Sequence, residues 1–266
     1  MAKPIYMKYR FLFFLILLCS IKAHAQDYSA YQKQTFIKGK DTLPYRILLP
    51  KHFSPLLHYP LIVFLHGSGE RGNDNESQLS HGADLFLRDS IREKYPAIIV
   101  FPQCPAASFW SNAIFSMDSI TNQRSFVFPE EGKPTVAMEM LLKLFNKLED
   151  DFRIDRKRIY IGGLSMGGMG TFELVRRKPK LFAAAFPICG GANPATARKL
   201  TRPHWWIFHG EKDDVVNPQL SKDMAAAIKN AGGNVMLTLY PDANHNSWDS
   251  TFSEKDLLPW LFSNHK

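Results

Sequence analysis

A serine between two glycines constrains this 266-residue chain more than any other feature, in the run Gly163-Leu164-Ser165-Met166-Gly167. A strand-like run, Arg158–Ile161, precedes it, and Met169, Phe172 and Val175 follow it at helical spacing. The pattern G-x-S-x-G is typical of a very tight turn from a strand into a helix, where a side chain in place of either glycine would collide with the strand or helix. We therefore expect Ser165 to stand clear of the backbone; the alternative is a glycine-rich turn with a spectator serine.

Solid apolar runs alternate with helical patterns along the rest of the chain. Such runs are typical of parallel strands that are buried on both faces. The sequence therefore predicts an α/β fold with a mainly parallel central sheet of about eight strands and helices on both faces. The expected strands are 31–37, 45–49, 61–65, 97–101, 158–161, 182–188, 205–208 and 235–240, the first two forming a hairpin.

Two long helices are expected between these strands. One opens at Pro134 and carries an apolar face that ends near Leu148, and the other starts at Asn217-Pro218 and stops at Gly232. Residues 105–132 are rich in aromatic side chains, and their apolar residues follow neither the spacing of a helix nor that of a strand. Because irregular segments of that length are usually functional, we expect a lid or a wall of the substrate site there.

The N-terminus has the layout of a secretory signal peptide. Basic residues precede the apolar run Phe11–Leu18, and Ala23-His24-Ala25 supplies a cleavage site. A retained membrane anchor is the alternative, but this run is far shorter than the roughly 20 residues that span a bilayer. We therefore expect residues 1–25 to be removed, and residues 26–266 to form a single catalytic domain without a membrane span, secreted or periplasmic.

Charge and cysteine content exclude several functions. Removal of four basic residues with the signal peptide lowers the formal net charge from +8 to about +4, which does not favour a nucleic-acid partner. Cys104 and Cys189 remain; export permits a disulfide between them, and buried thiols are the alternative. The Cys and His spacing matches no zinc site, so we expect neither a metal nor a cofactor.

A serine nucleophile needs a base and an acid, which follow in the order Ser, Asp, His in this kind of fold. Asp213 follows the apolar strand 205–208, and His245 follows the strand 235–240, so both fall at the carboxyl edge of the sheet, as Ser165 does. His52, His58 and His204 precede strands, His81 falls in a predicted helix, and His66 and His209 are expected to support strand-exit turns. The spacing after His209-Gly210 favours Asp213 over Asp214.

The loop after the strand 61–65 reads His66-Gly67-Ser68-Gly69-Glu70-Arg71-Gly72. Its glycines let backbone N–H groups converge on an anion. The N–H groups of Met166 and Ser68 are therefore predicted to form an oxyanion hole. A phosphate-binding loop is the alternative, but the Lys-Ser/Thr ending of a P-loop is missing. Glu70 and Arg71 are expected to serve structural ion pairs rather than to contact substrate.

Aromatic residues lie near the predicted site in the sequence. Trp248 is three residues after His245, and Phe109-Trp110 stands in the irregular segment. We expect Trp248 and Trp110 to line the substrate site, with burial in the core as the alternative.

At this point the chain resembles secreted esterases of the phospholipase/carboxylesterase, or predicted peptidase, group. The resemblance rests on 66–72, Pro102-Gln103-Cys104-Pro105, Gly163–Gly168, Cys189-Gly190-Gly191, His209-Gly210-x-x-Asp213 and His245-x-x-Trp248. That group is related to feruloyl esterases, polyhydroxybutyrate depolymerases and dienelactone hydrolases. The resemblance implies the α/β-hydrolase fold, with Ser165, Asp213 and His245 as a catalytic triad; Asn217-Pro218 departs from the usual Val-Pro.

The expected function is hydrolysis of carboxylic esters through an acyl-enzyme, with short-chain or aromatic esters, small or borne on a polysaccharide, as substrates. A serine peptidase on the same fold is the second hypothesis, which the lack of an extra cap or propeller domain disfavours. A secreted binding protein without catalysis is the third, which residues of a triad in the correct order disfavour.

Overall fold

The computed structural model describes residues 26–117, 119–120 and 124–266, so the predicted signal peptide lies outside the described residues. Eight strands form one sheet in the order β1-β2-β4-β3-β7-β8-β9-β10. Their bounds are β1 Gln32–Lys38, β2 Asp41–Leu48, β3 Tyr59–Leu65, β4 Ile98–Pro102, β7 Ile154–Leu164, β8 Ala184–Ile188, β9 His204–Gly210 and β10 Val235–Tyr240.

The sheet is parallel from β4 to β10 and antiparallel at its β1–β2 edge. β3 and β4 are buried along their whole length, as their solid apolar runs require. The α/β-hydrolase fold and its mainly parallel sheet of eight strands are thus confirmed. β1 and β2 form an antiparallel hairpin with its turn at Gly39, as predicted.

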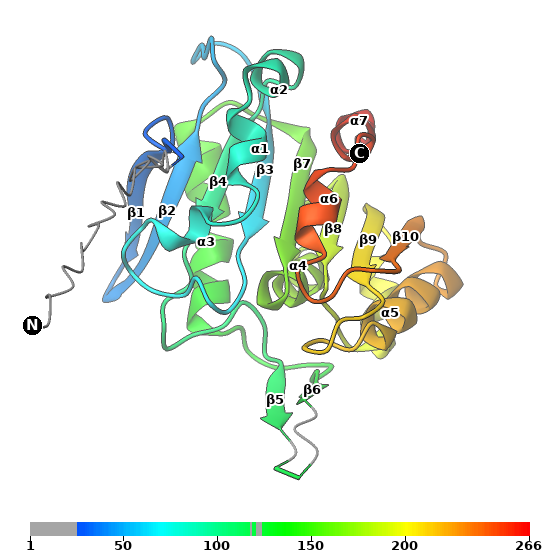
Figure 1. The fold of residues 1–266 in the computed structure, drawn as a ribbon. Coiled ribbons are helices and arrows are strands. Elements are labelled where there is room, and N and C mark those ends of the chain that lie inside the picture. The colour runs from blue at the N-terminus through cyan, green and yellow to red at the C-terminus, as the bar shows by residue number, and fades with distance from the viewer. Residues whose placement is uncertain (1–25, 118, 121–123) are drawn as a thin grey trace, which may run out of the picture.

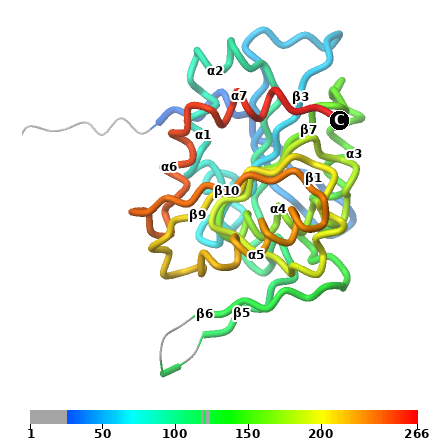
Figure 2. The backbone as a smooth tube through the Cα atoms, turned by 90° about the vertical axis from the view of Figure 1, so that its right-hand side faces the viewer, coloured from blue at the N-terminus to red at the C-terminus, as the bar shows by residue number. Residues whose placement is uncertain are grey.

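Helices cover both faces of the sheet (Figures 1 and 2). On one face lie α1 (Ala83–Leu87), α2 (Asp89–Lys94), α6 (Trp248–Phe252) and α7 (Leu257–Ser263); on the other lie α3 (Val136–Asp151), α4 (Met166–Arg177) and α5 (Gln219–Asn230). Two short 3₁₀ turns, η1 (Ser77–Leu79) and η2 (Pro194–Leu200), lie in the connections. Each face has its own apolar core, with Leu141 and Phe172 in one and Leu258 and Phe101 in the other.

The start of α3 differs slightly from the expectation. The helix begins at Val136, and the Thr135 hydroxyl accepts the backbone N–H of Met138 at 3.1 Å. Thr135 is therefore the N-cap, and Pro134 precedes the helix instead of opening it. His81 is likewise in the turn before α1 and not in a helix.

The segment predicted as irregular contains a two-stranded antiparallel hairpin, β5 (Ile114–Met117) and β6 (Arg124–Val127). We call this hairpin the arm. It projects from the lower end of the molecule in Figure 1 and exposes more than half of the Ile114, Phe115 and Met117 side chains. A pair of strands without a covering layer is marginal alone, so its position depends on contacts at its base, described below.

No helix within the described ranges is long and apolar enough to cross a membrane.

Both described cysteines are free thiols that the fold buries. Burial raises the pKa of Cys104 to about 12 and also raises the pKa of Cys189, so both thiols are protonated near neutrality.

We expect a disulfide-exchange reagent to detect two thiols in residues 26–266 when this protein is unfolded without reductant. The native protein should react far more slowly. Thiols that appear only after reduction would show that the two cysteines pair.

Candidate active site

Ser165 stands between the last residue of β7 and the first residue of α4, with φ 53° and ψ −117°. Such a conformation is strained for a residue with a Cβ and persists only where the surroundings enforce it. A Cβ added to Gly163 would collide with the Gly167 carbonyl, and one added to Gly167 would collide with the carbonyl of Leu65. The glycine spacing therefore has a steric cause: β3, β7 and α4 meet here without room for side chains.

The structure brings the three predicted residues together. Ser165 Oγ is 2.9 Å from His245 Nε2, and His245 Nδ1 is 2.8 Å from Asp213 Oδ2. Because a carboxylate only accepts, His245 Nδ1 carries a hydrogen and donates it to Asp213, which leaves Nε2 free to accept from the serine hydroxyl. This is the geometry that activation of a serine requires.

The Asp213 side chain is fully buried. Its Oδ1 accepts the backbone N–H groups of Val215 and Val216, at 2.9 and 2.8 Å, and its Oδ2 accepts from His245 and His209. Burial by itself raises the pKa of Asp213, but the hydrogen bonds from His209, His245 and Val216 outweigh burial and hold the pKa well below its usual range. The carboxylate therefore stays ionised beside His245.

Asp214 occupies a different place. Its side chain is exposed, and its backbone N–H donates to Asn244 Oδ1 at 3.2 Å. The structure thus places Asp213, and not its neighbour, against His245.

Sequence reasoning assigned His209 only a supporting hydrogen bond, and the structure shows that this bond goes to Asp213 itself, at 3.1 Å. The other strand-exit histidine, His66, is also buried, accepts the backbone N–H of Cys104 at 2.9 Å and donates to Gly67 O. Burial lowers the pKa of His66 to about 4, so this ring is neutral. In the sequence, each of these two histidines stands at the end of a strand and is followed by a glycine, and this pattern is the signal by which both can be found.

Ser68 and Met166, the predicted oxyanion pair, line one cavity together with Ser165. The cavity has a volume of about 530 Å³. Met166 is the first residue of α4, where a backbone N–H has no acceptor within its own helix. The remaining wall is mostly apolar and includes Phe109, Phe115, Phe126 and Met169; none of the described residues that line the cavity is acidic.

Trp110 does not reach this cavity. It is completely buried, packs edge-on against His66 with ring centroids 5.4 Å apart, and lies where a Cβ on Gly170 would be. The expected substrate contact is therefore wrong for Trp110, and its neighbour Phe109 lines the cavity instead.

Trp248 packs against His245 but is not among the residues that line the cavity at Ser165. Its ring centroid is 5.5 Å from that of His245 and 5.0 Å from that of His81. Trp248 lines a second, more polar cavity of about 480 Å³ between α1 and α6, with Ser80, Asp84 and Arg88 in its wall.

Arg71 does not form the expected ion pair, whereas Glu70 lies within ion-pair distance of His81 and His66. Arg71 donates to the carbonyls of Ser68, Ala106 and Ser108 and stacks over Phe109, and no ion pair of Arg71 occurs among the described residues. Glu70 lies 3.7 Å from His81 Nε2, and its Oε2 is buried without a hydrogen-bond partner in the described structure. Arg71 therefore fixes the loop and the cavity wall.

One group of potential metal ligands occurs in the described residues, formed by Cys189, Asp213 and His245, whose ligand atoms lie within 4.8 Å of one another. Asp213 and His245 already bond each other there. Burial, and next the charge of Asp213, raise the pKa of the Cys189 thiol, so it offers no thiolate. The donor set fits a hydrogen-bonded Asp–His pair better than a metal centre.

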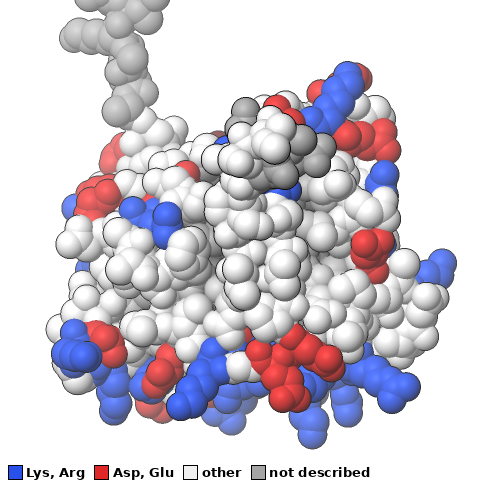
Figure 3. Space-filling view, turned by 90° about the horizontal axis from the view of Figure 1, so that it is seen from below, with Lys and Arg blue, Asp and Glu red and all other residues white. Residues whose placement is uncertain are grey.

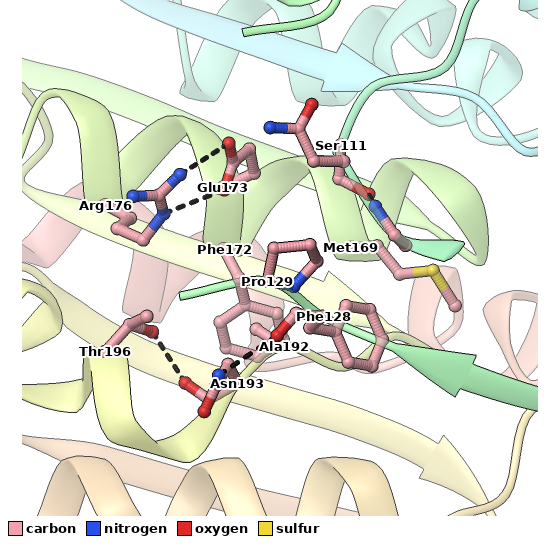
Figure 4. A pocket seen from close by; sticks show the side chains of 12 residues that line it. Ser111, Phe128, Pro129, Met169, Phe172, Glu173, Arg176, Ala192, Asn193 and Thr196 are labelled. Atoms are coloured by element: carbon pink, nitrogen blue, oxygen red, sulfur yellow. Dashed lines mark hydrogen bonds and ion pairs between the residues drawn. The ribbon is translucent and has the colours of Figure 1, made fainter. Parts of the chain in front are cut away.

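The base of the arm is fixed to α4 and to Asn193, which precedes η2. Asn193 donates to the Phe128 carbonyl at 3.0 Å (Figure 4). Arg176 donates to Glu130 O at 3.2 Å, and Arg177 donates to Gly132 O at 2.9 Å. Glu173 holds both arginines, at 2.8 and 2.7 Å. A crevice of about 20 Å³ lies between the base of the arm and α4, and it has room for about one water.

From the end that carries the arm, the centre of the surface is almost uncharged, and many charged side chains gather along one edge (Figure 3).

The sequence profile of the phospholipase/carboxylesterase family matches residues 56–255. Lysophospholipase-like protein 1 of Mus musculus is 28% identical over 217 residues, which cover 77% of this chain and 87% of that protein. The bifunctional acetylxylan esterase/xylanase XynS20E of Neocallimastix patriciarum is 37% identical over 175 residues, covering 65% of this chain but only 22% of that protein.

Among solved structures, a thermostable esterase superposes with a TM-score of 0.78 at 34% identity. The match covers 89% of this chain and 64% of the other, so this chain spans less than two thirds of that esterase.

The steric account of the serine turn is testable with two alanine variants. Gly167→Ala should lower the free energy of unfolding by about 3 kcal/mol, because its Cβ meets backbone that cannot move aside. Gly69→Ala in the nearby loop is the control; nothing lies within 4 Å of its added Cβ, so the change should stay below about 1 kcal/mol. Urea unfolding measures both. Equal stability of the two variants would contradict the close approach.

Proposed function

Because this chain belongs to the phospholipase/carboxylesterase family, we propose that it is an exported serine esterase that uses Ser165, His245 and Asp213. The observation that carries the proposal is the unbroken hydrogen-bond chain from the Ser165 hydroxyl through His245 to the buried Asp213 carboxylate. The apolar run and cleavage pattern before Gln26 support export.

In the proposed reaction, Ser165 Oγ attacks the ester carbonyl while His245 Nε2 takes its proton. The N–H groups of Met166 and Ser68 stabilise the oxyanion of the tetrahedral intermediate. His245 then gives the proton to the leaving alcohol, and an acyl-enzyme remains on Ser165. Water, deprotonated by His245, releases the acid by the same steps and restores the serine. Asp213 keeps His245 oriented and stabilises its protonated form.

The cavity at Ser165 supports a small or aromatic acyl group. Phe109, Phe115, Phe126 and Met169 offer an apolar wall, which suits a flat ring or a short chain. The relation to an acetylxylan esterase/xylanase is consistent with a small acyl group on a polysaccharide.

The cavity beyond Trp248 supports a polar alcohol. The alcohol must leave from the side of His245, because His245 supplies its proton. Trp248 connects that ring to a wall of Ser80, Asp84 and Arg88, where hydroxyl groups of a sugar can bond. Trp248 is thus proposed to contact the alcohol part of the substrate, while Phe109 contacts the acyl part.

Ser165→Ala should lower kcat by about 10⁴-fold or more and abolish labelling by a fluorophosphonate, since Oγ is the atom that attacks. Ser263→Ala, an exposed serine on α7, is the matched control and should behave as the unchanged protein. Near-normal hydrolysis by the first variant would remove Ser165 from the mechanism.

Phe126→Ala should lower kcat/KM for methyl ferulate about 10-fold and leave p-nitrophenyl acetate within about 3-fold, because only the larger acyl group reaches the arm. Ile37→Ala, on exposed β1, is the control for loss of an apolar side chain elsewhere. The panel includes p-nitrophenyl butyrate, p-nitrophenyl palmitate and a peptide p-nitroanilide. Preference for the palmitate or the anilide would overturn the proposed substrate class.

A further inference from the structure

His209, near the end of β9, is a second imidazole on the Asp213 carboxylate. The ring is completely buried, and its Nε2 lies 3.1 Å from Asp213 Oδ2 and 2.9 Å from the Val216 carbonyl. Both neighbours can only accept a hydrogen bond. Nε2 therefore carries a hydrogen, which it shares between the Val216 carbonyl and the Asp213 carboxylate.

The opposite edge of the ring is fixed as well. Nδ1 is 2.7 Å from the hydroxyl oxygen of Ser221 on α5, and that oxygen also lies 2.9 Å from the carbonyl oxygen of Gly190 after β8. Ser221 is also completely buried. His209 thus has no freedom to turn, and it ties the carboxylate to two neighbouring elements of the fold.

Asp213 depends on this contact because water does not reach its side chain. Its Oδ2 has two donors, His245 Nδ1 and His209 Nε2. Loss of the second donor leaves a buried charge under-satisfied, which is costly in a low dielectric. Because the N–H groups of Val215 and Val216 still hold Oδ1, the carboxylate then interacts more strongly with His245, its remaining imidazole donor.

We propose that His209 is a positioning residue, which holds the Asp213 carboxylate at its place beside His245 and shares its charge. The inference rests on the proposed function of Ser165, His245 and Asp213. According to this inference, His209 acts on the catalytic residues through Asp213 and does more than stabilise the end of β9.

The other titratable groups around His245 are few. Cys189 lies beside the Asp213–His245 pair and is a protonated thiol, His81 packs against Trp248, and Glu70 lies 3.7 Å from His81 and 3.9 Å from His66. Among the described residues, none of these three groups shares a hydrogen bond or an ion pair with His209, whereas Asp213 does, so a substitution of His209 acts on the pair through Asp213.

The experiment compares two substitutions. His209→Phe removes the donor and keeps a ring, whereas His209→Gln keeps an N–H near the position of Nε2. His209→Phe should lower kcat by up to about 100-fold, because His209 no longer holds the Asp213 carboxylate in its position beside His245. KM should be almost unchanged, because neither His209 nor Asp213 touches the substrate. The acidic limb of its kcat/KM profile should move to higher pH, since the less satisfied carboxylate favours protonated His245. His209→Gln should restore most of kcat and return the limb.

His66→Gln is the matched control, because His66 is an equally buried strand-exit histidine that does not contact Asp213. It should lose stability and some activity while the acidic limb stays in place. If His209→Phe does not fold, Ser221→Ala frees Nδ1 and should move the limb in the same direction by less. A limb that stays in place in a folded His209→Phe or Ser221→Ala variant, or His209→Gln as impaired as His209→Phe, would make His209 merely structural.

Proton NMR separates this inference from the proposed function. Imidazole hydrogens bonded to a carboxylate resonate far downfield, and the unchanged protein should show two such signals, from His209 and His245. His209→Phe should lose one and shift the other. If the unchanged protein neither hydrolyses esters nor labels with a fluorophosphonate, the proposed function fails; the two signals and their response still decide whether His209 holds Asp213.

Discussion

The rest of the site depends on the close approach of Gly167 to the carbonyl of Leu65. The sheet order places β3 beside β7, so the helix that leaves β7 must pass over the end of β3 with no side chain between them. That contact forces Ser165 into a positive φ and brings the loop after β3, with Ser68, to the serine. The strain at one residue is held in place by packing on three elements, since α4 also meets β8, where Gly168 faces the Ile188 carbonyl.

Parallel strands explain why residues 165, 213 and 245 meet although they are far apart in the chain. β7, β9 and β10 run in one direction, so the loops that follow them open at the same edge. The loop after β9 contains a tight turn, in which Asp213 Oδ1 accepts the N–H groups of Val215 and Val216. The backbone of this turn therefore holds the Asp213 carboxylate independently of its bonds to His209 and His245.

The sequence was sufficient for the sheet, the serine turn and the positions of Asp213 and His245, because apolar runs, glycine spacing and chain order are local or topological signals. It was not sufficient for Phe109 and Trp110. These neighbours point in different directions, and in a segment without periodicity nothing local decides which one enters the core. The contact of His209 with Ser221 and the bonds from Asn193, Arg176 and Arg177 to the base of the arm were also hidden, since their partners come from elements far apart in the chain.

The bonds at the base of the arm connect the serine with the wall of its cavity. α4 begins at the residue after Ser165, and near its other end Arg176 and Arg177 hold carbonyls at the base of the arm. Glu173 pairs with both arginines in a largely buried position, where such contacts are screened less by solvent than at an exposed surface. The serine that attacks and the base of the arm are therefore both connected to α4, and the arm carries Phe115 and Phe126 into the wall of the cavity.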